Sequence, residues 1–157
     1  MTTNSLSAHV TSPEETGALA GRLAQLLTSG DVLLLTGDVG AGKTHFARHL
    51  IQSILSVPED VPSPTFTLVQ EYDTKRGPLW HCDLYRLTST GEVEELGLVD
   101  AFETAICLVE WPDRLGSLAP AEALEIRLDP GSGEHDRQLT ATWTGNTWTD
   151  RVTAWLS

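Results

Sequence analysis

Basic residues are scarce in this chain. It contains 10 Lys and Arg against 22 Asp and Glu, which gives a formal net charge of −12 at pH 7. Because proteins hold the phosphates of nucleic acids with Lys and Arg, this balance argues against a chain that grips RNA or DNA by itself. It fits a protein partner with a basic face more easily.

Cysteine is also rare, and long apolar runs are missing. Cys82 and Cys107 both fall in predicted strands, where we interpret them as buried thiols, since a disulfide would be unusual in the reducing cytosol. The apolar runs are far too short to cross a bilayer. The first thirty residues lack the cationic start and apolar stretch of a signal peptide. We therefore expect a cytoplasmic protein that makes no membrane contact.

The remaining composition is that of an ordinary globular protein. Hydrophobic residues make up 40% of the chain and charged residues 20%. A length of 157 residues suits one domain with a core of several strands and helices. We predict a single domain over residues 1–157.

The most informative stretch begins at Val32. A short apolar run of strand length opens into a glycine-rich turn, and the turn leads into a segment with the apolar spacing of an amphipathic helix. The turn reads GDVGAGKT over residues 37–44 and fits the phosphate-loop pattern G-x-x-x-x-G-K-[ST] at every position. The residues predicted to bind a nucleotide are Gly37, Asp38, Val39, Gly40, Ala41, Gly42, Lys43, Thr44 and His45.

Each part of this pattern has a physical reason. Glycines let the backbone N–H groups wrap closely around phosphates, and the start of the following helix directs its positive end at the anion. Lys43 would place its ammonium on the β and γ phosphates, and the Thr44 hydroxyl would bind Mg²⁺. A glycine-rich turn can also be purely structural, but the flanking strand and helix favour ATP binding.

Periodicity and turn residues predict the other elements. A helix starts after the capping Ser12 and ends at Gly30, and the helix after the phosphate loop ends near Leu55. Strands are expected at 67–72, 79–84, 105–109, 123–128 and 137–143, with helices at 90–102 and 147–156 and one short strand within 1–11. These elements predict an α/β fold: a single P-loop NTPase domain with a parallel sheet core, an antiparallel extension and flanking helices.

Two acidic residues end predicted strands. Asp83 follows the apolar stretch 79–82, and Glu110 follows 106–109. An acid in this place is often only a solvated strand end, but beside a phosphate loop it is where phosphoryl transfer needs a carboxylate. We assign Glu110 to Mg²⁺, directly or through water, and Asp83 to positioning the metal or the attacking water. Lys43, Asp83 and Glu110 form the predicted catalytic set.

Four more side chains have two interpretations each. Thr65, in the SPTF loop at 63–66, is either a switch residue that senses the γ phosphate or part of a proline-fixed turn. Arg86 either offsets phosphoryl charge or pairs with the acidic helix. Trp111 either covers the nucleotide or packs on the sheet. His81 alternates with Asp83 along one strand, so it either hydrogen-bonds near the site or is an ordinary strand histidine.

Several motifs together resemble one known family. GDVGAGKT, SPTFTLV, HCDLYRL, EELGL and ICLVEWPDRL, in this order and at these spacings, are similar to the TsaE family, formerly YjeE. The resemblance covers residues 36–115. It implies a small bacterial ATPase of tRNA threonylcarbamoyladenosine (t6A) synthesis, with ATP and Mg²⁺ as its ligands.

The resemblance also implies partners and roles. The expected partners are the TsaD and TsaB subunits, which modify adenosine 37 of tRNAs, so tRNA would be contacted only indirectly. ATP hydrolysis would reset their complex between turnovers, and would be weak without them. The family roles fall on Lys43, Thr44, Glu110 and Asp83. His45 is a departure, because the family often has Thr there.

Two other functions remain open from the residues alone. A small-molecule kinase would share the phosphate loop, but such enzymes usually bring several arginines over the phosphates, and the late arginines here are widely spread. A nucleotide-gated adaptor would bind ATP with negligible turnover and control a partner through its binding state.

Overall fold

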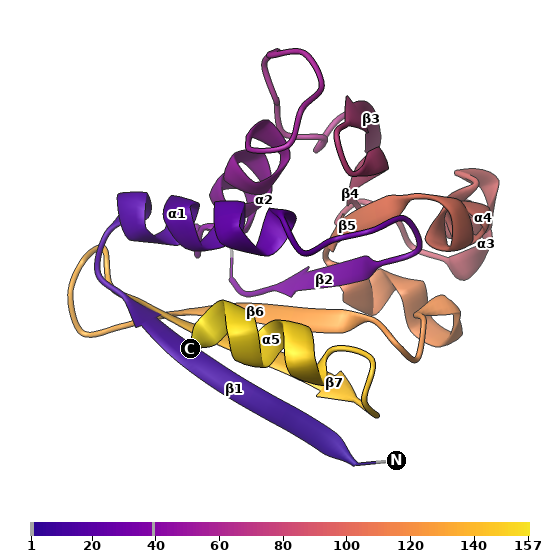
Figure 1. Cartoon of the computed structure of the whole chain (residues 1–157). Helices are drawn as coiled ribbons and strands as arrows, with labels where there is room; N and C mark the ends of the chain where they lie inside the picture. Colours follow the sequence, from indigo (N-terminus) through magenta and orange to yellow (C-terminus); the bar gives the residue numbers. More distant parts are fainter. Residues whose placement is uncertain (1, 39) are drawn as a thin grey trace.

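The computed structural model describes residues 2–38 and 40–157, and in them the chain forms one sheet with helices on both faces (Figure 1). The strands are β1 (Thr3–Val10), β2 (Val32–Thr36), β3 (Val69–Thr74), β4 (Gly77–Asp83), β5 (Ile106–Glu110), β6 (Leu124–Pro130) and β7 (Arg137–Thr144). The helices are α1 (Pro13–Ala24), α2 (Lys43–Gln52), α3 (Thr90–Glu95), α4 (Leu98–Thr104), the 3-10 helix η1 (Pro112–Leu118) and α5 (Thr149–Leu156). In these described residues, no helix is long and apolar enough to cross a membrane.

The sheet is mixed, and its centre is parallel. Its strand order is β1-β7-β6-β2-β5-β4-β3. β6, β2, β5 and β4 run parallel, whereas β7 and β1 extend one edge antiparallel and β3 closes the other as a hairpin with β4. The predicted parallel core and antiparallel extension are therefore confirmed. Parallel strands end at one edge of the sheet, which brings the ends of β2, β4 and β5 together.

Both faces of the central strands are buried. In β5, Ile106 and Leu108 pack into the larger apolar cluster with α1, α2 and α5, whereas Cys107 and Val109 pack into a second cluster with α3 and α4. Such two-sided burial explains why β5 reads as a continuous apolar run. Cys82 and Cys107 are free and buried, and burial raises the pKa of the Cys107 thiol to about 12.

The first helix begins as predicted and ends earlier. The Ser12 side chain accepts a hydrogen bond of 3.1 Å from the Glu15 amide, as the capping pattern indicates. α1 ends at Ala24 and not at Gly30, because the amides of Leu26 and Leu27 already bond to carbonyls three residues back. The tightened turn still buries Leu27.

The helix predicted over 90–102 is two helices. Gly97 has a φ of 78° and breaks the segment between α3 and α4, because only glycine adopts this left-handed conformation without a steric cost. Leu98 and Phe102 remain buried, so the helical spacing of apolar residues continues across a break in the backbone. That continuity explains why the periodicity predicted one helix.

Other boundaries also differ from the prediction. The connection between the strands predicted at 67–72 and 79–84 is shorter than those bounds imply, since Asp73 pairs with Pro78 and Thr74 with Gly77, and β3 starts at Val69. α2 ends at Gln52, α5 starts at Thr149, and η1 was not predicted. The short N-terminal strand is the eight-residue β1, which pairs with β7 along its whole length.

Candidate functional site

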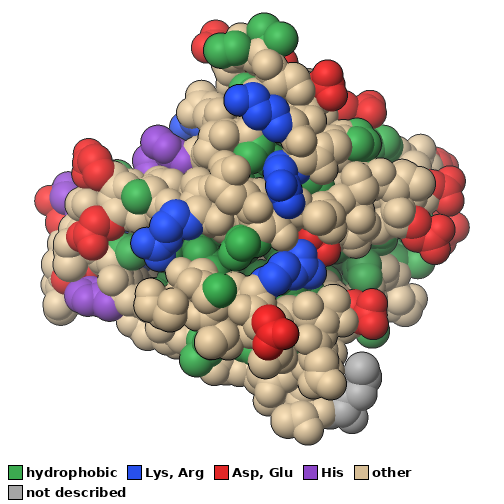
Figure 2. Space-filling model, viewed as in Figure 1, with side chains coloured by type: hydrophobic (Ala, Val, Ile, Leu, Met, Phe, Trp, Pro, Cys, Tyr) green, Lys and Arg blue, Asp and Glu red, His purple; other side chains and the backbone are tan. Residues whose placement is uncertain are grey.

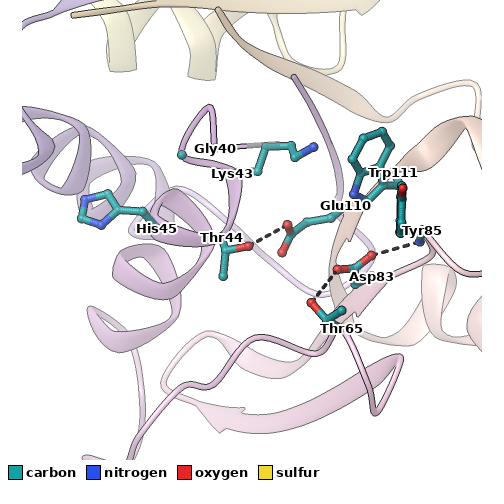
Figure 3. A pocket seen from close by; sticks show the side chains of 10 residues that line it. Gly40, Lys43, Thr44, His45, Thr65, Asp83, Tyr85, Glu110 and Trp111 are labelled. Carbon is teal, nitrogen blue, oxygen red and sulfur yellow. Dashed lines mark hydrogen bonds between the residues drawn. The ribbon is translucent and has the colours of Figure 1, made fainter. Parts of the chain in front are cut away.

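A cavity of 420 Å³ opens at the carboxyl ends of the central strands, beside the start of α2 (Figure 3). It receives residues from four separate stretches of the chain. Its lining consists of Gly40, Gly42, Lys43, Thr44, His45, Thr65, Asp83, Tyr85, Glu110 and Trp111. The structure therefore brings together five of the nine predicted nucleotide-binding residues, both predicted carboxylates, Thr65 and Trp111.

The glycine turn connects β2 to α2 in the predicted place. Gly37 has a φ of 137°, and a Cβ atom there would lie 2.5 Å from the carbonyl oxygen of Leu128 on β6. A side chain at position 37 is thus excluded by both conformation and space. Gly42 precedes α2 and has no side chain to cap it, so the first amides of the helix receive no side-chain acceptor from this residue. Val39 lies outside the described residues.

Lys43 is buried in the wall of the cavity. Its ammonium nitrogen donates a hydrogen bond of 2.5 Å to the Gly37 carbonyl and lies 3.7 Å from the centre of the Trp111 ring. Burial lowers the pKa of Lys43 from its ordinary value, and the charges of Glu110 and Asp83 act in the opposite direction. The site thus holds a cation in a poorly solvated place.

Glu110 is held at both of its oxygens. The Thr44 hydroxyl on α2 donates to Glu110 Oε1 at 2.9 Å, and His81 Nε2 on β4 lies 2.7 Å from Oε2. The His81 and Glu110 side chains are 0% and 2% exposed. Thr44 and Glu110 offer hard oxygen ligands next to each other, which is the type of ligand that Mg²⁺ takes.

Asp83 lies beside Glu110 because β4 and β5 pair with these two residues in register. Its Oδ2 accepts a hydrogen bond of 3.2 Å from the Thr65 hydroxyl, and its Oδ1 accepts one of 3.0 Å from the Tyr85 amide. Thr65 is also 2.7 Å from the Ser63 hydroxyl. The SPTF loop is therefore tied directly to the carboxylate (Figure 3).

Trp111 reaches the cavity through an unusual backbone conformation. Its φ of 59° is left-handed, a rare conformation for a large residue, and it turns the chain from β5 into η1. The indole lies over Lys43, and its ring centre is 4.8 Å from that of Tyr85. Left-handed strain of this kind is common where a side chain has a functional task.

Arg86 lies outside the lining of the cavity. Its guanidinium donates to the carbonyls of Thr65 and Phe66, at 3.1 and 2.8 Å. It holds the SPTF loop by its backbone, which neither interpretation of the sequence foresaw. His45 turns from the phosphate loop toward α1, where its Nε2 lies 2.9 Å from the Pro13 carbonyl oxygen.

The sequence did not point to a second hollow beside the loop. It has a volume of 170 Å³ and shares Gly42 and His45 with the main cavity. Its lining is Pro13, Thr16, Ala41, Gly42, His45, His135 and Arg137. Arg137, at the start of β7, donates to the Ala41 carbonyl at 3.1 Å. No local pattern around Arg137 could have revealed this contact.

The sheet has a parallel centre, a glycine turn that leads from β2 into α2, and two carboxylates at the ends of β5 and β4. These features define an α/β protein with a phosphate-loop turn. Comparison with known sequences then identifies the family. The family model described as threonylcarbamoyl adenosine biosynthesis protein TsaE matches residues 10–139. The chain belongs to the TsaE family.

Individual relatives agree with this assignment. The tRNA threonylcarbamoyladenosine biosynthesis protein TsaE of Bacillus subtilis is 42% identical over 135 residues, which cover 85% of this chain and 83% of that protein. The protein of the same name from Aquifex aeolicus is 43% identical over 104 residues, covering 66% and 74%. The crystal structure of YdiB from Bacillus subtilis superposes with a TM-score of 0.78 at 32% identity, covering 99% of this chain and 96% of that one.

Proposed function

We propose that this chain is a single P-loop ATPase domain that supports t6A biosynthesis on tRNA by binding and hydrolysing Mg-ATP. One observation carries the proposal: Lys43, Thr44, Asp83 and Glu110 line one cavity beside the glycine turn. The similar proteins from B. subtilis and A. aeolicus are named as tRNA threonylcarbamoyladenosine biosynthesis proteins. A role in tRNA modification also favours a cytoplasmic localisation.

The phosphates of ATP fit the wall that the loop and α2 provide. Amides at the start of α2 and the Lys43 ammonium supply donors and positive charge there. The second hollow adjoins this wall through Gly42 and His45, and we assign the nucleoside to it, beside Pro13 and Arg137.

The residues present fit Mg²⁺. Thr44 and Glu110 lie 2.9 Å apart at the cavity wall, and both are oxygen ligands. Bound there with ATP, the ion would neutralise charge on the β and γ phosphates. Thr44 and Glu110 would hold it from α2 and β5, two elements whose positions are fixed by the buried core.

We assign Asp83 to orienting the attacking water. Its carboxylate lines the cavity and is fixed by the Thr65 hydroxyl and the Tyr85 amide. A fixed acceptor can hold one water in line with the γ phosphate, and so lowers the entropic cost of the attack. Thr65 joins this carboxylate to the SPTF loop, which gives the loop a way to sense the state of the site.

The proposed partners are the TsaB and TsaD subunits, and the proposed task is resetting their complex between turnovers. The surface charge supports a protein partner more than direct tRNA capture. Figure 2 shows acidic side chains gathered where α3 and α4 lie in Figure 1, while Lys and Arg are scattered over the face in view. Over residues 87–109 the sequence contains no Lys or Arg and five acidic residues, none of them buried, at Glu92, Glu94, Glu95, Asp100 and Glu103.

The deciding experiment measures t6A formation on tRNA in a mixture of TsaB, TsaD and the enzyme that supplies the threonylcarbamoyl group, with and without this chain. Repeated turnover is expected only with the chain and ATP hydrolysis, and Lys43→Met should abolish the gain. Transfer of phosphate to a metabolite instead of water would establish the kinase. Full stimulation without measurable hydrolysis would establish the nucleotide-gated adaptor.

A further inference from the structure

His81 does not line the cavity, but its ring contacts the carboxylate of Glu110, which does. It is fully buried on β4, and its Nε2 lies 2.7 Å from Glu110 Oε2. The residues that line the cavity do not include it. Any effect of His81 on a ligand must therefore pass through Glu110.

The pair arises from the register of the sheet. His81 pairs with Leu108 and Asp83 pairs with Glu110, so His81 sits one layer deeper than the two carboxylates and on the same face. This layer lies beneath α2, among the side chains of the larger core cluster. A polar side chain in such a layer is costly unless it has a partner.

The hydrogen-bond pattern indicates where the imidazole carries its proton. Among the residues that the structure describes, none offers a hydrogen-bond partner to the buried Nδ1 atom of His81. A proton on Nδ1 alone would leave a buried N–H without an acceptor, a rare arrangement that costs about 1–3 kcal/mol. With the proton on Nε2, the ring donates to Glu110, and Thr44 donates to the other carboxylate oxygen at 2.9 Å.

We propose that His81 is a positioning residue for Glu110: it donates from Nε2 to Oε2 and so fixes the orientation in which Oε1 faces Thr44 and the cavity. The inference rests on the proposed function. Without this donor, Oε2 would be a buried charged oxygen with no partner, and the carboxylate would rotate to find one. A metal held by Thr44 and Glu110 would then lose affinity, whereas contacts of the nucleotide with the phosphate loop would remain. Partners of a metal-ligating carboxylate typically change metal affinity about 10–100-fold.

Two amide side chains, each of which mimics one ring nitrogen of His81, test the proposed role in the full-length protein. The side-chain nitrogen of Gln reaches the position of Nε2, whereas that of Asn reaches only the position of Nδ1. We therefore compare His81→Gln with His81→Asn, and use His81→Leu as the apolar variant. Two affinities are measured for each variant: that of ADP in EDTA by calorimetry, and that of Mn²⁺ for the ADP complex by electron paramagnetic resonance.

The expected result is selective. His81→Asn and His81→Leu bind Mn²⁺ about 10–100-fold more weakly in the ADP complex. His81→Gln stays close to the parent, and all variants keep the parent's affinity for ADP in EDTA. Equal Mn²⁺ affinity in all of them overturns the inference, and so does an equal loss of both affinities, since that reports general damage. If His81→Leu does not fold, the Gln and Asn pair decides.

The ring proton can be located without any nucleotide. Nitrogen-15 chemical shifts of the His81 ring in the free protein distinguish a proton on Nε2 from one on Nδ1 alone. A proton on Nε2 supports the inference, and a proton on Nδ1 alone overturns it. If the parent protein binds neither ADP nor Mn²⁺ with ADP, the proposed function fails, whereas the shifts still decide the hydrogen bond.

Discussion

The ammonium of Lys43 lies 3.7 Å from the centre of the Trp111 ring and donates to the Gly37 carbonyl. Lys43 and Trp111 both line the cavity that we assign to ATP. A phosphate bound beside Lys43 would compete with the carbonyl and the indole for the ammonium. We therefore expect nucleotide binding to change the surroundings of Trp111.

Tryptophan emission should report this exchange. Adding Mg-ADP is expected to change the fluorescence of the protein, and Trp111→Phe should remove most of the change. The chain has five tryptophans, of which Trp143, Trp148 and Trp155 are buried in the larger core cluster. Trp80→Phe, on the face of β4 that packs into the second cluster, is the control and should keep the signal. A signal that survives in Trp111→Phe would contradict the assigned position of the nucleotide.

Lys43→Met should separate binding from stability. Loss of a charged hydrogen-bond donor is expected to weaken ADP binding about 10–100-fold. Burial lowers the pKa of Lys43, which means that folding disfavours the cation and that this cost is present at neutral pH. The melting temperature of the empty variant should therefore equal or exceed that of the parent.

The control for this substitution is Lys75→Met, at an exposed position in the β3–β4 turn. It should leave nucleotide affinity unchanged. A clear drop in the melting temperature of Lys43→Met would show that the bond to Gly37 and the contact with Trp111 outweigh the cost of burial.

Asp83→Asn and Glu110→Gln should reduce hydrolysis more than binding. Both keep the shape of the side chain and remove its charge, so kcat is expected to fall about 100-fold or more, as for the loss of a group that positions or accepts a proton. Calorimetry with ADP in EDTA should give affinities near the parent's. Equal turnover in the parent, Lys43→Met and both of these variants would reject the site.

The sequence predicts the parts of the site that depend on residues close together in the chain. It does not predict the contacts between distant segments. The phosphate-loop turn is local, and Asp83 and Glu110 follow from the rule that parallel strands end at one edge. The bond between His81 and Glu110 depends on the register of β4 with β5, which no single segment encodes. The grip of Arg86 on the SPTF loop likewise joins segments that meet only in the folded chain.

The fold shows the same division. β1 pairs along its length with β7, at the other end of the chain, and as a mostly exposed edge strand it has little apolar pattern to reveal it. The periodicity did not predict the break at Gly97, because Leu98 and Phe102 keep the spacing of a single helix. A pattern of burial predicts which face is inside, but not whether the backbone is continuous.

Thr65→Val should slow hydrolysis without changing nucleotide affinity. The variant keeps the shape of the side chain and removes the hydroxyl that bonds Asp83 and Ser63. One net hydrogen bond is worth about 0.5–1.5 kcal/mol, so kcat is expected to fall about 2–10-fold. Ser63→Ala, which removes only the bond between the two hydroxyls, is the matched control and should have a smaller effect. Unchanged kcat in Thr65→Val would show that Asp83 does not depend on the SPTF loop.

The stability of the protein should fall below neutral pH, and His49 should contribute to the fall. Burial lowers the pKa of His49 from its ordinary value of 6.5, and the neighbouring His45 and Arg48 act in the same direction. The His45 and His49 ring centres are 4.4 Å apart, and the ring of His49 packs closely on Gly17 of α1. Water therefore has little room to solvate a positive charge on the His49 ring.

The direction of the effect follows from proton linkage. The unfolded chain binds a proton at His49 near the ordinary pKa, whereas the folded protein does so only at lower pH, so the folded state loses stability as pH falls through the interval between the two values. His49→Gln should lose less melting temperature than the parent between about pH 7.5 and about pH 5. His135→Gln, an exposed histidine in the loop before β7, controls for the loss of a histidine as such. Parallel melting curves for the parent and His49→Gln over this range would mean that the packing of α2 on α1 tolerates the charge.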